Sequence, residues 1–68
     1  MRVETLEKWA EVSAKLAAHG GRLYMMQYGA GHPEGFHAWF WFPTYSDVEI
    51  VTHNPTVQAA IIKYSSGQ

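Results

Sequence analysis

Residues 36–42 of the 68-residue chain read Phe-His-Ala-Trp-Phe-Trp-Phe, and they predict the central strand of a sheet. Aromatic residues favour strands because they pack well on a pleated surface. Side chains alternate between the two faces of a strand. One face therefore carries Phe36, Ala38, Phe40 and Phe42, and the other carries His37, Trp39 and Trp41. Because the first set is wholly apolar, we expect it to lie beneath helices and the tryptophans to lie on the opposite side of the sheet.

Two more strands are predicted on either side of this stretch. Residues 22–28 read Arg-Leu-Tyr-Met-Met-Gln-Tyr and reach residue 36 through a loop with three glycines and a proline, which predicts a hairpin. Residues 48–52 form a third strand, in which Val48, Ile50 and Thr52 alternate with Asp47, Glu49, Val51 and His53. This more polar set is expected on the uncovered side of the sheet. In residues 22–28 both alternating sets are apolar, so the sequence leaves open which face of that strand is buried.

A helix is predicted at each end of the chain. Residues 3–19 place their apolar residues at helical spacing, and Gly20-Gly21 ends the helix because glycine accepts the left-handed conformation. The face expected to be buried carries Leu6, Trp9, Ser13 and Leu16, with Val12 and Ala17 beside them. Asn54 and Pro55 have the side chains expected at the cap and first position of a second helix. The buried face of the second helix is predicted to carry Val57, Ala60, Ile61 and Tyr64.

The predicted fold class is α+β in the order α-β-β-β-α, as one compact domain spanning residues 1–68. Short connections favour a three-stranded antiparallel sheet. We expect both helices to pack on one face of this sheet. The alternative is one helix on each face, which would bury the tryptophans as well.

The order and size of these elements resemble the double-stranded RNA-binding domain. That family grips phosphates with lysines at the start of its second helix. Residues 55–59 of this chain read Pro-Thr-Val-Gln-Ala, and Lys63 comes only near the end of the helix. The resemblance therefore implies the topology and carries over no RNA-binding residue.

Charge and composition exclude several classes of protein. The formal net charge is −1, and no lysine or arginine occurs from residue 23 to residue 62, so a phosphate-binding stripe is not expected. The chain has no cysteine, which excludes a disulfide scaffold and a thiolate metal site. No run of about 20 apolar residues indicates a membrane span, and the expected location is the cytoplasm.

The predicted function is protein–protein interaction through the uncovered aromatic face of the sheet, without catalysis and without a cofactor. Exposed apolar patches mark binding surfaces, and Trp and Tyr are common anchors of interfaces. The partner is either another protein or a second copy in a homodimer. Stand-alone domains without a catalytic motif are often accessory proteins of phages or mobile elements, and by this association the chain is expected to be one. The expected binding residues are Trp39, Trp41, His37, Tyr24, Tyr28 and Glu49.

Two other functions compete with this interpretation. His32, Glu34 and His37 are weak candidate ligands for a divalent metal or a small molecule in a homodimeric module. Trp39 and Trp41 are also able to stack the bases of a single-stranded nucleic acid. The lack of nearby cations argues against stable binding of this kind at physiological salt.

Overall fold

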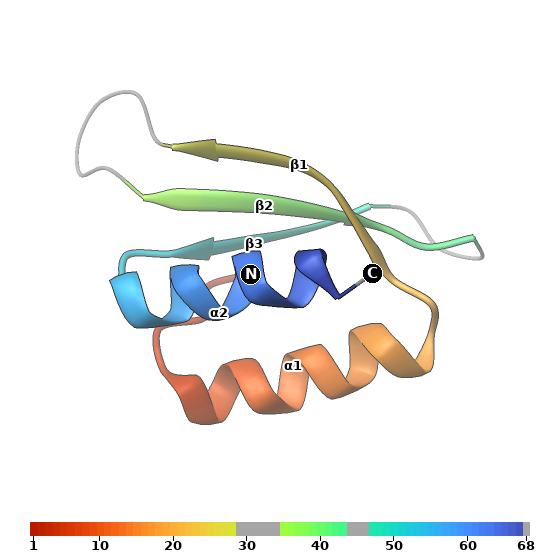
Figure 1. Ribbon diagram of the computed structural model, residues 1–68, viewed down its shortest axis with the longest axis horizontal. Helices are drawn as coiled ribbons and strands as arrows, with labels where there is room; N and C mark the ends of the chain where they lie inside the picture. The colour runs from red at the N-terminus through yellow and green to blue at the C-terminus, as the bar shows by residue number, and fades with distance from the viewer. Residues whose placement is uncertain (29–34, 44–46, 68) are drawn as a thin grey trace.

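The computed structural model describes residues 1–28, 35–43 and 47–67. Its elements are α1 (Leu6–Ala18), β1 (Arg22–Tyr28), β2 (Phe36–Trp41), β3 (Val48–Thr52) and α2 (Pro55–Ser66). The strands form one antiparallel sheet in the order β1-β2-β3. Both helices lie on the same side of the sheet (Figure 1), which confirms the predicted fold class. Within these residues, neither helix is long and apolar enough to cross a membrane.

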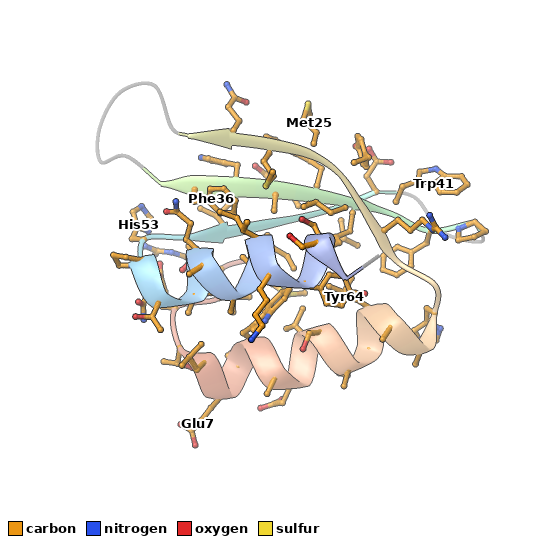
Figure 2. The ribbon with its side chains drawn as sticks, viewed as in Figure 1. Glu7, Met25, Phe36, Trp41, His53 and Tyr64 are labelled. Atoms are coloured by element: carbon orange, nitrogen blue, oxygen red, sulfur yellow. The ribbon has the colours of Figure 1, made fainter. Side chains whose placement is uncertain are left out.

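The core lies between β2 and the two helices. The apolar set of residues 36–42 is buried as predicted, and Phe40 is completely enclosed. The centroid of its ring lies 6.3 Å from the ring centroid of Trp9 in α1 and 5.9 Å from that of Tyr64 in α2. Figure 2 shows Phe36 and Tyr64 between the sheet and the helices. Phe40 therefore connects the central strand of the sheet with both helices.

Helix α1 is shorter than the predicted span of residues 3–19. It begins at Leu6 because Thr5 is its N-cap, and the Thr5 hydroxyl accepts a hydrogen bond from the Lys8 N–H at 3.1 Å. Leu6 was wrongly predicted to be buried: it lies in the first turn and is 48% exposed. The buried stripe of the helix is Trp9, Val12 and Leu16.

Helix α1 ends at the glycines as predicted. Gly20 has a φ of 71°, in the left-handed region that glycine enters without a Cβ penalty. The N–H of Gly21 then donates to the carbonyl oxygen of Leu16 at 2.7 Å, and the N–H of Gly20 donates to that of Ala17 at 3.3 Å. These two bonds form a Schellman motif, which satisfies carbonyl groups at the end of the helix.

The N-terminal segment lies along the outer edge of β3, a contact that the sequence did not predict. Arg2 forms a parallel bridge with Val51. The Val51 N–H donates to the Met1 carbonyl oxygen at 2.8 Å, and the Val3 N–H donates to the Val51 carbonyl oxygen at 2.9 Å. Val3 is fully buried beneath the sheet. Residues 1–3 therefore cover the backbone of β3 on the side that faces away from β2.

Glu4 anchors this segment to the junction between β3 and α2. Its carboxylate accepts hydrogen bonds from the His53 N–H at 2.8 Å and from the Thr52 hydroxyl at 3.1 Å. The Nδ1 atom of His53 lies 2.9 Å from the other carboxylate oxygen. The side-chain bond with His53, followed by the backbone bond, lowers the pKa of Glu4 from 4.5 to about 2.

This shift makes part of the stability depend on pH. Because the pKa of Glu4 is lower in the folded chain, its carboxylate stabilises the fold above pH 4.5 and loses that effect as the pH falls toward 2. We expect Glu4→Gln to cost about 1 kcal/mol at pH 7, since partial exposure to water weakens such bonds. The difference from wild type should vanish near pH 2, as measured by urea unfolding.

The matched control for this experiment is Glu7→Gln. Glu7 lies on α1, and its side chain points away from the sheet (Figure 2). The free energy of unfolding at pH 7 should therefore fall less in Glu7→Gln than in Glu4→Gln. Equal losses in the two variants would contradict the anchoring role of Glu4.

Candidate interaction surface

The sheet face turned away from both helices is the candidate site, and we call it the open face. Residues directly opposite each other in an antiparallel pair share a face. Met25 lies opposite Trp39, and Trp39 lies opposite Glu49 on the next strand. Figure 2 shows Met25 pointing away from the helices. Among the described residues, this register and the contact between Tyr24 and Asp47 assign the following residues to the open face: Arg22, Tyr24, Met25, Gln27, His37, Trp39, Trp41, Asp47, Glu49 and Val51.

A β-bulge decides which residues of β1 reach this face. The register moves from Leu23 opposite Phe40 directly to Met25 opposite Trp39, so Tyr24 is the extra residue. Leu23 packs against the core, while Tyr24 and Met25 both turn to the open face. The bulge therefore decides which residues of β1 face the core, a question that the sequence had left open.

Polar contacts tie the strands together across the open face. The Tyr24 hydroxyl reaches over β2 and donates a hydrogen bond to the Asp47 carboxylate, which raises the pKa of Tyr24. The Nδ1 atom of His37 lies 2.7 Å from Glu49 Oε2. The His37 ring also stacks on Trp39 with 5.8 Å between the ring centroids and an interplanar angle of 18°. These contacts hold both carboxylates and the half-buried Trp39 in fixed positions.

Large apolar side chains remain accessible between these contacts. Trp41 and Tyr24 are each 50% exposed, and Met25 is 45% exposed. Trp41 lies at the end of the sheet farthest from His53 (Figure 2). A cluster of exposed apolar side chains on one face is typical of a binding surface.

Five of the six predicted binding residues come together on this surface: Trp39, Trp41, His37, Tyr24 and Glu49. The sixth, Tyr28, has its Cα opposite Phe36, and its side chain lies outside the described part of the chain. Met25 and Asp47 were not among the predicted binding residues. Alternation in the third strand did place Asp47 on the uncovered side, whereas nothing local indicated the bulge that turns Met25 outward.

The predicted metal site stays a prediction, because His32 and Glu34 lie outside the described residues. The Nδ1 atom of the third candidate ligand, His37, lies 2.7 Å from Glu49 Oε2. Among residues 1–28, 35–43 and 47–67, no group of three or more potential ligand side chains is present. Binding of nucleic acid also stays a prediction. The open face as defined carries the base Arg22 and two acids, Asp47 and Glu49, and the acids would repel phosphate groups.

A cavity opens on the helix side of the molecule. It has a volume of about 160 Å³ and lies between α1 and the ends of β2 and β3. Its lining includes Met1, Lys8, Lys15, Leu16 and Phe42. Sites for small molecules usually measure about 300–1,000 Å³. The cavity is therefore a weaker candidate site than the open face.

The chain matches no family model, no curated protein and no solved structure. The likeness to the double-stranded RNA-binding domain therefore rests on element order and size alone. The fold and the site define the class: a two-layer α+β domain with both helices on one face of a sheet and an aromatic second face left open.

Proposed function

We propose that the domain is a non-enzymatic protein–protein interaction module, an adaptor or inhibitor, that binds a partner protein through the open face. The exposure of half the Trp41 side chain on the side away from the helices carries this proposal. Tryptophan and tyrosine are the side chains most enriched among the residues that dominate binding energy. The proposal includes a cytoplasmic location, with which the cysteine-free composition is compatible.

The charges of the open face indicate what kind of partner fits. Asp47 and Glu49 lie on its β3 side, and each carboxylate is held by a neighbouring side chain. Trp41 and Met25 supply an apolar area beside them. A partner with an apolar patch bordered by lysine or arginine would match this arrangement, because opposite potentials favour docking in one register.

Substitution of Trp41 tests the proposal. Trp41→Ser should weaken partner binding by at least about tenfold, since anchors of this kind often contribute 2 kcal/mol or more. The partner is isolated with the wild-type domain as bait, and the affinity of the purified partner is measured by calorimetry. Leu6→Ser is the matched control because Leu6 is 48% exposed but lies on α1, across the molecule from the open face.

The two variants distinguish binding at the open face from non-specific binding through any exposed apolar side chain. Loss of affinity in Trp41→Ser with full affinity in Leu6→Ser supports the proposal. If Trp41→Ser keeps the affinity of the wild type, or if only Leu6→Ser loses affinity, the partner binds at another surface. Circular dichroism confirms that each variant keeps its fold.

A further inference from the structure

The outer edge of β1 carries a second surface, distinct from the open face. β1 is at the end of the strand order β1-β2-β3, and within the described residues no strand pairs with its outer side. An edge strand presents unpaired N–H and C=O groups, and natural proteins protect such edges with lysine, proline, β-bulges or very short strands. The bulge of β1 lies at Tyr24, and after it residues 25–28 pair regularly with β2 and contain no charge and no proline.

The opposite edge of the sheet is already occupied. Residues 1–3 hydrogen-bond along β3 through Met1, Val3 and Val51. The sheet is therefore able to grow on the β1 side alone. Growth on one side ends when two molecules have met, whereas two free edges would allow an open chain of molecules.

The side chains of β1 are exposed on both faces of the sheet. Met25 points to the open face and is 45% exposed, as described above. Met26 lies opposite Ala38, on the helix side, and is still 47% exposed. The helices leave Met26 accessible, since the strand that α2 contacts most is β3, at the opposite edge of the sheet from β1. A strand added beside β1 would shield both methionines at once.

We infer that a second copy of this chain occupies the β1 edge. The two β1 strands pair antiparallel about a two-fold axis and form one continuous six-stranded sheet. An identical strand suits this edge because the uncharged residues 25–28 set no like charges against each other. Met26 of each copy then lies beside the junction on the helix side, and the two open faces become one larger surface.

Oligomeric mass and a charged substitution test the inference. Light scattering on a sizing column should give twice the 7.7 kDa chain mass for the wild type. Met26→Lys should give the mass of one chain at the same concentration, because two lysines then face each other across the junction. Met26 is accessible to water in the single chain, so this variant keeps its fold. Leu6→Lys, an equally exposed site on α1, should stay dimeric.

Hydrogen exchange locates the contact. Amide groups of residues 25–27 should gain protection as the wild-type concentration rises, and Met26→Lys should lose this gain. A wild-type chain that stays monomeric at millimolar concentration would overturn the inference. So would a dimer that Trp41→Ser dissociates and Met26→Lys leaves intact, since that result places the contact on the open face. Partner binding is measured separately with Trp41→Ser, so either proposal is able to fail alone.

Discussion

Replacing Phe40 with alanine is expected to lower the free energy of unfolding by about 3–5 kcal/mol, which is the usual range for a buried phenylalanine. Phe40 is fully enclosed and contacts the rings of Trp9 and Tyr64. Removing its ring leaves a cavity where β2, α1 and α2 meet, and the rigid neighbours fill it only in part. A domain of this size has a total stability of only about 3–5 kcal/mol from its core, so much of the variant should be unfolded.

The neighbouring residue is the control for this experiment. Trp41→Ala removes a larger side chain from the same strand, but Trp41 is half exposed on the open face. Its cost should be below about 1 kcal/mol, since substitutions at exposed positions seldom exceed this value. Urea unfolding followed by circular dichroism at a fixed protein concentration measures both variants.

A conservative variant keeps the Phe40 prediction testable if the alanine variant does not fold. Phe40→Leu retains most of the apolar volume and should give an intermediate loss. Equal losses in Trp41→Ala and Phe40→Leu would contradict the assignment of the two faces of β2. Such a result would also remove the basis for the open face as the binding surface.

The second large effect is expected at Gly21, where Gly21→Ala should cost about 1–3 kcal/mol through overpacking. A Cβ atom at this position would lie 2.7 Å from Cε1 of Phe42 and 3.2 Å from Cδ2 of Leu16. The backbone of Gly21 is held by its bond to the Leu16 carbonyl at 2.7 Å and by the Tyr64 hydroxyl, which donates to the Gly21 carbonyl at 3.2 Å. The chain is therefore held on both sides, and the buried Phe42 ring must move instead.

Gly67→Ala is the matched control for Gly21→Ala. A Cβ atom at Gly67 would come no closer than 3.6 Å to other atoms, which is an ordinary contact, and its φ of −85° suits any residue. The melting temperature should therefore fall clearly in Gly21→Ala and change little in Gly67→Ala. A wild-type melting temperature in Gly21→Ala would show that Phe42 has room to move and that the junction between α1 and β1 is loosely packed.

Part of the open face was predictable from the sequence, and part of it was not. Alternation in residues 36–42 and 47–53 was enough to assign Trp39, Trp41, His37 and Glu49 to one face. Tyr24 and Met25 were not assignable in this way, because β1 is apolar in both of its alternating sets. Their common orientation comes from the bulge, which depends on how β1 pairs with β2.

The order of the elements, the buried face of β2, the cap at Asn54 and the helix end at Gly20 were all predictable from the sequence. Each of these depends on residues that are neighbours in the chain, so periodicity and backbone preference are sufficient to predict it. The bulge at Tyr24, the pairing of residues 1–3 with β3 and the bonds between Glu4 and His53 depend instead on contacts between distant parts of the chain. Glu4 and His53 are 49 positions apart in the sequence. A contact between them stabilises the chain only once the sheet and helices have folded and brought the two side chains together.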